Sequence, residues 1–287
     1  MRAISTDVLL LVDKPAGMSS HDVVALARRA LGTRKVGHGG TLDPFATGLL
    51  VLLAGRGTRL LQFVPSEPKV YEATIRFGSE TDSDDVTGHV VREAPLPAPA
   101  SVVAALPSLT GDLEQLPPAY SAKHIAGERA YAIARRGEVP ALAPARVHVE
   151  RWQVIDHDED RLVARIACGT GTYIRALARD LGRAVGSAAH LEALRRIRVG
   201  PFDVHDATDV ETLRSGAPRV HDLVEALGTM PHVRLEADEA RRVRHGMRIP
   251  ATGEGARAAL VAHDGELIAV ADRDGEWWQP AVVLATA

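Results

Sequence analysis

The chain has 287 residues, of which 46% are hydrophobic and 25% charged, a balance typical of a globular protein of about two domains. Its single cysteine, Cys168, excludes an internal disulfide and a multi-cysteine zinc site. The N-terminus lacks the basic and apolar segments of a signal peptide, and no apolar run approaches the ~20 residues that span a membrane. We therefore expect a cytoplasmic protein without membrane contact.

The formal net charge is −3, which by itself argues against a nucleic-acid partner. Acidic residues are concentrated at 80–85 and 156–160, however, and arginines cluster at 195–198 and 241–244, so the chain can still carry a basic face. Solvated helix faces explain each cluster equally well. The basic residues are 30 arginines and only four lysines, so we expect each lysine where a compact ammonium is needed. These lysines are Lys14, Lys35, Lys69 and Lys123.

The first part of the chain predicts a strand, a helix and a displayed acid. Residues 7–12 form an apolar run, and Ser20 is suited to cap a helix over 22–31. The stretch 37–48 holds four glycines and one carboxylate, Asp43, which is typical of a tight loop that a ligand approaches closely. From spacing alone, Asp43 is explained either by chemistry or by an Asx-type turn before proline.

The middle of the chain alternates between strands and loops. Residues 49–53 predict a buried strand or helix, and alternating apolar residues predict a half-buried strand over 71–77. The polar, acidic segment 78–88 is expected to be a surface loop. A short helix is expected over 101–109. Residues 117–146, with a helix over 128–136, are predicted to be a surface excursion that grips a ligand.

A strand over 161–168 is followed by the turn Gly169–Thr172 and then by a helix. Tyr173 and Arg175 fall in the first turn of that helix, just beyond a strand end, where ligands bind in α/β arrangements. The chain has no Gly-Lys-[Ser/Thr] sequence, which argues against an NTPase.

Residues 190–198 predict another helix. After about residue 230 the pattern changes to a basic helix and three short strands, with Asp-Gly turns typical of hairpins. The strands are expected over 258–262, 267–271 and 277–284. We therefore divide the chain into a first domain over 1–229 and a small β-rich domain over 230–287.

Five motifs, in order along residues 8–202, resemble those of the TruB-type pseudouridine synthases. The central one is Gly37-His38-x-Gly40-Thr41-Leu42-Asp43-Pro44 with Ala46-Thr47-Gly48. The others are Asp13-Lys14-Pro15-x-Gly17-x-Ser19-Ser20, Tyr71, Pro117-Pro118-x-Tyr120-Ser121-Ala122-Lys123, and Cys168-x-x-Gly171-Thr172-Tyr173-Ile174-Arg175 with His190-Leu191-x-x-Leu194-Arg195-Arg196. The C-terminal part resembles a reduced PUA-type RNA-binding domain.

The resemblance implies an α+β fold, with a mixed central sheet flanked by helices and a PUA-like β-rich domain. It implies the conversion of uridine 55 in the T-loop of tRNA to pseudouridine, in which the N-glycosidic bond breaks, the uracil rotates and a C–C bond forms. This isomerisation needs no cofactor and no metal. The expected partner is tRNA, and the bacterial stand-alone form implies a monomer without an obligate protein partner.

The resemblance also implies site residues. Asp43 matches the catalytic carboxylate, Arg175 the arginine that pairs with it, and Tyr71 the aromatic that stacks on the uracil and assists C5 deprotonation. Tyr173 and Leu194 match residues that line the pocket. Each has an alternative explanation, which is a helix surface charge for Arg175 and ordinary core packing for Tyr71, Tyr173 and Leu194.

A base in a folded loop must be flipped out before it can react. His38 matches the residue that occupies the vacated space. The basic residues expected to contact phosphates are Lys14, Lys123, Arg195 and Arg196.

Two departures from the family pattern concern RNA affinity rather than chemistry. Gly39 stands where the family usually has Thr, and Thr170 where it commonly has Lys. Two rival functions are a dyskerin-like synthase that works with guide RNA and a tRNA-binding chaperone without chemistry. A binder alone has no need of Asp43 opposite Arg175.

Overall fold

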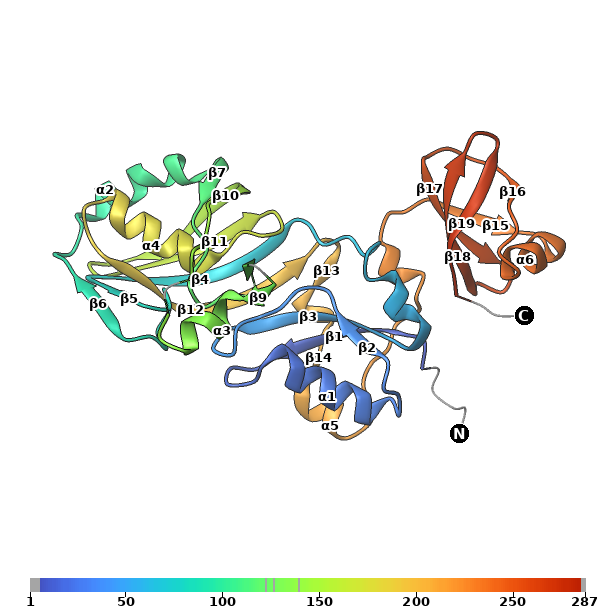
Figure 1. Cartoon of the computed structure of the whole chain (residues 1–287), viewed down its shortest axis with the longest axis horizontal. Coiled ribbons are helices and arrows are strands. Elements are labelled where there is room, and N and C mark those ends of the chain that lie inside the picture. The colour runs from blue at the N-terminus through green and yellow to red at the C-terminus, as the bar shows by residue number, and fades with distance from the viewer. Residues whose placement is uncertain (1–5, 122, 126, 139, 285–287) are drawn as a thin grey trace.

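The computed structural model describes residues 6–121, 123–125, 127–138 and 140–284. Two sheets organise the chain, a large one that carries most of the helices and a small one formed by the C-terminal residues (Figure 1). No helix in these described ranges has the length and apolarity needed to cross a membrane.

The large sheet is mixed, as predicted. Its strand order is β14-β1-β3-β12-β4-β11-β10-β7, with β13 paired to β12 and β2 to β3. The β1–β14 and β3–β12 pairs are parallel and the others antiparallel. The strands are β1 (Leu9–Lys14), β2 (Val36–His38), β3 (Thr47–Ala54), β4 (Lys69–Phe77), β7 (Gly111–Gln115), β10 (Ala145–His157), β11 (Arg161–Cys168), β12 (Ala189–Val199), β13 (Phe202–Asp203) and β14 (Thr208–Asp209).

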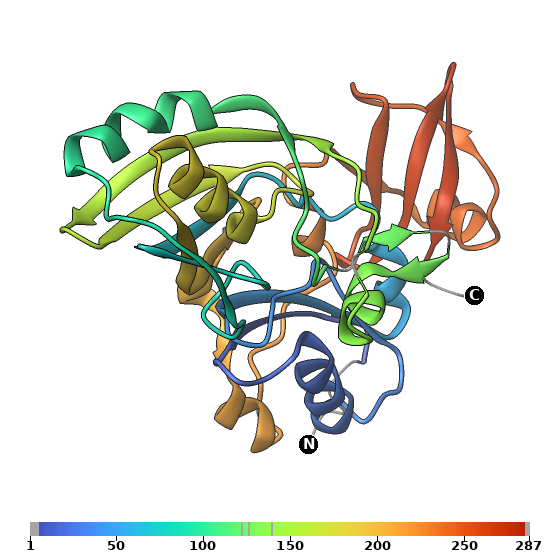
Figure 2. The same cartoon turned by 60° about the vertical axis from the view of Figure 1, so that its left-hand side comes forward.

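Helices cover this sheet at two places (Figures 1 and 2). Helices α1 (Ser20–Ala30) and α5 (Val210–Arg214) pack on β1 and β3, and α2 (Pro99–Ala105) and α4 (Ile174–Ala184) pack over β4, β11 and β12. The 3₁₀ turns are η1 (Gly55–Leu60), η2 (Leu106–Leu109), η3 (Val204–Asp206) and η4 (Glu225–Leu227).

The run Leu49–Leu53 is a strand because β3 is buried on both faces. Leu50 and Leu52 belong to the cluster beneath α1 and α5, whereas Leu49, Val51 and Leu53 belong to a cluster on the opposite face. A strand covered on both faces has no polar positions, which explains the continuous apolar run. Its first residues follow the Asp43 loop directly, so this buried strand fixes the loop.

The helix predicted over 190–198 is wrong, because these residues form the central strand β12. Register shifts occur between Leu191 and Ala193 and between Arg196 and Arg198 where β12 pairs with β4. A β-bulge changes the alternation of side chains. Leu191 and Leu194, three residues apart, therefore enter the same core and produce a helix-like spacing.

The segment 78–88 was expected at the surface, and this prediction is also wrong. It contains β5 (Ser79–Thr81), which pairs with β6 (Val90–Glu93), and Glu80, Asp84 and Asp85 are buried. Buried carboxylates require positive partners, and arginines of α4 supply them. The acidic segment is therefore internal to the fold.

A smaller correction concerns the start of α1. Ser19, not Ser20, is the N-cap, and it forms a capping box with Asp22. Ser20 is buried, and its Oγ accepts a hydrogen bond from Leu42 N at 2.9 Å. Ser20 thus ties the helix to the loop that carries Asp43.

The excursion over 117–146 contains a short hairpin and a helix. These are β8 (His124–Ile125), β9 (Glu128–Arg129) and α3 (Ala130–Arg135), close to the helix predicted over 128–136. Residues 122, 126 and 139 lie outside the described residues.

The small sheet has the order β15-β17-β18-β19-β16, with α6 (Ala237–Arg244) beside it, and the three predicted strands are confirmed. Its strands are β15 (His232–Leu235), β16 (Ile249–Pro250), β17 (Arg257–Ala262), β18 (Leu267–Asp274) and β19 (Trp277–Val283). One apolar cluster includes Val261 and Val270 of this sheet together with Leu60 and Leu223. The domain division at residue 230 stays a prediction.

Candidate active site

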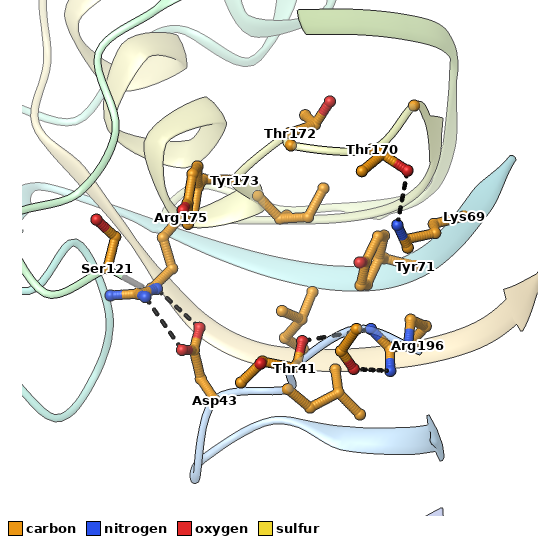
Figure 3. Close-up of a pocket in the computed structure, with 16 residues that line it drawn as sticks. Thr41, Asp43, Lys69, Tyr71, Ser121, Thr170, Thr172, Tyr173, Arg175 and Arg196 are labelled. Atoms are coloured by element: carbon orange, nitrogen blue, oxygen red, sulfur yellow. Dashed lines mark hydrogen bonds and ion pairs between the residues drawn. The ribbon is translucent and has the colours of Figure 1, made fainter. Parts of the chain in front are cut away.

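A pocket of about 280 Å³ opens between the Asp43 loop, the start of β4 and the turn before α4 (Figure 3). Six of the ten predicted site residues line it. They are Asp43, Tyr71, Tyr173, Arg175, Leu194 and Arg196.

The Asp43 loop is held from both sides. Ala46 N donates to Asp43 O at 3.1 Å, and Gly17 N donates to Pro44 O at 2.8 Å. Ser20 binds the backbone of Leu42, as described above. These bonds fix the backbone around a side chain that is 34% exposed and directed towards the pocket.

Arg175 meets Asp43 at one end of this pocket (Figure 3). Its Nε lies 2.9 Å from Asp43 Oδ2, and its Nη2 donates to Asp43 Oδ1 at 3.1 Å. The remaining donors bind Ser83 O and Tyr120 O, both at 2.9 Å. The guanidinium, with its side chain only 4% exposed, is therefore fixed by three separate segments of the chain.

A second carboxylate stands behind this pair. Asp85 Oδ2 lies 3.4 Å from Arg175 Nη1, and Asp85 Oδ1 accepts hydrogen bonds from Ser83 Oγ at 2.8 Å and Thr87 N at 3.0 Å. Burial raises the pKa of Asp43, Arg175 opposes this effect, and Asp85 adds to it. The positive charge of Arg175 thus offsets the repulsion between the carboxylates of Asp43 and Asp85.

The opposite end of the pocket carries an ammonium group. Lys69, at the first position of β4, donates from Nζ to Thr170 Oγ1 at 3.0 Å. Tyr71, two residues along the same strand, and Leu194 of β12 line the pocket. Burial raises the pKa of Tyr71, so its phenol is neutral at physiological pH.

Lys14 and Arg196, both predicted to contact phosphates, bind backbone carbonyls in the structure. Lys14 is fully buried, and its Nζ donates to Met18 O at 2.7 Å and Pro15 O at 2.9 Å. Arg196 is 1% exposed and donates from Nε to Leu49 O at 2.8 Å and from Nη2 to Gly40 O at 3.1 Å. Lys14 also lies 3.3 Å from Pro44 O, so both cations bind carbonyls of the Asp43 loop, and their contacts with phosphates stay predictions.

The other predicted RNA-binding residues lie outside the pocket lining. Arg195 is an ion-pair partner of Asp13 at 2.6 Å, with its side chain 37% exposed, and Lys123 is exposed. His38, in β2, lies edge-on to His21 with ring centroids 6.0 Å apart, and burial lowers its pKa. Their contacts with RNA stay predictions.

The geometry is that of a small cavity with a fixed carboxylate, an aromatic wall and cationic groups. Over the described residues, no group of three or more His, Cys, Asp and Glu side chains is arranged to hold a metal ion.

Comparison with known proteins decides the family. Residues 28–174 match the family model described as TruB family pseudouridylate synthase, N terminal domain. The chain belongs to this TruB family. It is therefore a pseudouridine synthase.

Further matches extend over nearly the whole chain. Residues 175–217 match the tRNA pseudouridylate synthase B C-terminal domain and residues 230–285 the model named tRNA Pseudouridine synthase II, C terminal. The tRNA pseudouridine synthase B of Thermobifida fusca (strain YX) is 46% identical, over 97% of this chain and 99% of the relative. That of Nocardia farcinica (strain IFM 10152) is 46% identical over 96% and 92%.

Solved structures share the fold at low identity. One is a chain of an H/ACA RNP bound to a substrate RNA containing 2′-deoxyuridine, with a TM-score of 0.73 and 21% identity over 98% of this chain and 86% of that chain. Another is from the archaeal box H/ACA sRNP Nop10-Cbf5 complex, with a TM-score of 0.72 and 22% identity over 98% and 87%. These likenesses confirm the predicted fold class.

Two residues of the site, Asp85 behind Arg175 and Lys69 in the pocket, were not predicted from the sequence. Asp85 lies in the segment 78–88, which was predicted to be at the surface. It is buried because it pairs with Arg175 of α4, which is distant in the sequence. Lys69 was noted only as one of four lysines. Its position two residues before Tyr71 in an alternating strand places both side chains on one face, which is the signal that was overlooked.

Proposed function

We propose that the protein isomerises uridine 55 in the T-loop of tRNA to pseudouridine, with Asp43 as the catalytic carboxylate. The observation that carries the proposal is the ion pair of Asp43 with the buried Arg175 in a pocket of about 280 Å³. A carboxylate so placed is fixed in orientation, and the guanidinium favours its ionised form. The names of the relatives support tRNA as the substrate.

The reaction breaks the N1–C1′ bond of the nucleotide and forms a C5–C1′ bond. The proton on C5 leaves and N1 gains a proton, so the product is an isomer of the substrate. Asp43 acts at the reacting sugar and base. Arg175 holds the carboxylate in position as water is excluded by the incoming nucleotide.

Tyr71 provides a stacking surface for the uracil, and its hydroxyl assists removal of the C5 proton. Leu194 and Tyr173 complete the wall of the pocket. A uridine paired or stacked within a folded loop cannot reach such a recessed carboxylate. The nucleotide therefore flips out of the loop, at a cost of a few kcal/mol in lost stacking.

The test is incubation of the purified protein alone with an unmodified tRNA transcript, followed by mapping of pseudouridine at single-nucleotide resolution. We expect conversion at position 55 only, and none in a transcript with cytidine at that position. Conversion elsewhere with position 55 unchanged would overturn the assigned site.

The same experiment separates the stand-alone enzyme from its rivals. A guide-dependent synthase converts nothing without guide RNA and partner proteins, and a chaperone converts nothing under any condition. We favour the stand-alone form because the likeness to the H/ACA proteins is one of fold, at 21–22% identity, whereas the relatives at 46% are named tRNA synthases.

A further inference from the structure

The ammonium of Lys69 is nearly buried without an ion-pair partner. The residue is 8% exposed, and its Nζ makes one described hydrogen bond, to Thr170 Oγ1. Within the described chain, no carboxylate forms an ion pair with it. The nearby Glu67 accepts a hydrogen bond from Thr170 N at 2.5 Å instead. An ammonium has three donors and pays a desolvation cost when buried, and Lys69 lacks the set of carbonyl acceptors that offsets this cost at Lys14, so an anion would supply the missing acceptors.

In the other cations of the pocket, every guanidinium nitrogen has a partner. Arg175 binds Asp43 and two carbonyl oxygens, and Arg196 binds the carbonyls of Leu49 and Gly40. Among the pocket residues that the structure describes, Lys69 is thus the cation with the fewest bonded partners. Burial lowers its pKa, and the neighbouring Arg196 lowers it further.

The position of Lys69 indicates which part of a nucleotide it meets. Thr170 and Gly171 on one side, and Gly40 and Thr41 on the other, line the pocket and are exposed. A Cβ on Gly40 would lie 3.8 Å from Lys69 Cε, so this turn passes close to the lysine stem. Lys69 therefore lies beneath the rim, at the end away from Asp43 (Figure 3).

We propose that Lys69, oriented by Thr170, binds a backbone phosphate of the RNA where the strand enters the pocket, next to the nucleotide that reacts. The inference rests on the proposed function, since it takes the ligand to be RNA. A phosphate at the rim supplies the missing anion, while the base continues towards Tyr71 and Asp43. This contact fixes the entering strand and reads no sequence.

The test is a double-mutant cycle, in which the protein change is Lys69→Met and the RNA change is one uncharged methylphosphonate linkage. A series of RNA hairpins carries this linkage at each position in turn around the target uridine. Binding to the full-length protein and single-turnover conversion are both measured. We expect one linkage to weaken wild-type binding roughly 10- to 100-fold, and Lys69→Met to lose a similar factor with the ordinary RNA. The same linkage should weaken RNA binding by Lys69→Met less than about threefold further, because the lysine that contacts this phosphate is already absent.

Two matched variants control the cycle. Lys69→Arg keeps the positive charge and should remain sensitive to that linkage, whereas Lys35→Met, which removes an exposed lysine outside the pocket, should show independent effects. The salt dependence of binding should also fall by about one charge in Lys69→Met. Because Lys69→Met removes a buried charge, its melting temperature should equal or exceed that of the wild type.

Additive effects of Lys69→Met and every linkage would overturn the proposal. So would a loss of conversion rate without any loss of binding, which would assign Lys69 to the base instead. The binding cycle remains decisive if the wild type converts no uridine. Failure of the proposed function and failure of this inference are therefore distinguishable.

Discussion

The carboxylate of Asp43 is subject to opposing influences. Burial and the nearby Asp85 raise its pKa, while Arg175, 2.9 Å away, lowers it. A catalytic carboxylate must be ionised, so the rate should fall at low pH as Asp43 becomes protonated. The balance between Asp85 and Arg175 sets where this fall occurs.

Removal of the Asp85 charge should move the pH at which the rate falls. In Asp85→Asn the negative charge that disfavours ionised Asp43 is absent, so the acid limb of the single-turnover rate should shift to lower pH. The maximum rate should fall about tenfold, because Arg175 loses one of its two carboxylate partners. Asp82→Asn, in the same segment but outside the contacts of Arg175, is the control. A shift of the acid limb to higher pH would contradict this electrostatic account.

Tyr71→Phe separates stacking from proton removal. The ring remains, so RNA binding should change less than threefold, but the rate should fall about 100-fold if the hydroxyl assists C5 deprotonation. Deuterium at C5 should then slow the variant more than the wild type. An unchanged rate in Tyr71→Phe would remove the hydroxyl from the mechanism and leave the ring as a stacking surface.

At the scale of elements, α4 joins the site to the acidic segment. Arg175, Arg179 and Arg183 are spaced by four residues and therefore lie on one face of the helix. Arg179 Nη1 is 2.7 Å from Asp84 Oδ2, and Arg183 pairs with Glu80. These ion pairs bind the acidic segment to α4 and thus position Asp85 behind Arg175.

Arg179→Met should destabilise the fold by about 3–5 kcal/mol, because Asp84 would be left buried without its partner. Both side chains of this pair are only 7% exposed. The double variant Arg179→Met/Asp84→Asn should recover at least half of the loss, and asparagine tolerates the φ of 60° at this position. Denaturant unfolding measures all three proteins. No recovery in the double variant would show that packing, not charge, dominates.

The loss of folding stability in Arg179→Met should also depend on pH. Burial raises the pKa of Asp84 to about 6 even with Arg179 present, and removal of Arg179 raises it further. A carboxyl whose pKa is higher in the folded than in the unfolded state loses stability as pH rises between the two values. The deficit of Arg179→Met should therefore be smaller at pH 5 than at pH 8. A deficit that grows on acidification would contradict this sign.

Local patterns predicted the elements that obey one periodicity. The alternation over 71–77 and the Asp-Gly hairpins were sufficient for β4 and for the C-terminal strands. β12 was mistaken for a helix because two bulges break its alternation. The segment 78–88 was placed at the surface because its burial depends on arginines of α4, which lie roughly 90–100 residues further along the chain. The pairing of Asp43 with Arg175 was predicted only through the motif resemblance, since neither side chain alone predicts the other.

At the scale of the whole molecule, the two sheets share an apolar cluster. Val261 and Val270 of the small sheet belong to the cluster that contains Leu60 and Leu223. Arg56 Nη1 also donates to Leu284 O at 2.7 Å across this junction. Such shared burial couples the folding of the two parts.

We therefore expect one calorimetric unfolding transition for the whole chain. Val270→Ala, at a fully buried position, should lower that single transition by several degrees, since it removes two buried methyl groups. Leu96→Ala, at an exposed position, should leave it almost unchanged. Two separate transitions, of which Val270→Ala moves only one, would show that the sheets unfold independently.

The central claim is that Asp43 performs chemistry rather than holding the loop. The most direct measurement compares Asp43→Asn with the wild type under single-turnover conditions, using unmodified tRNA, with binding measured on the same samples. We predict a loss of conversion at position 55 by at least about 10⁴-fold, with tRNA affinity within about threefold of the wild type. Asp112→Asn, an exposed carboxylate outside the pocket, should convert like the wild type. Conversion by Asp43→Asn at the wild-type rate would contradict the account.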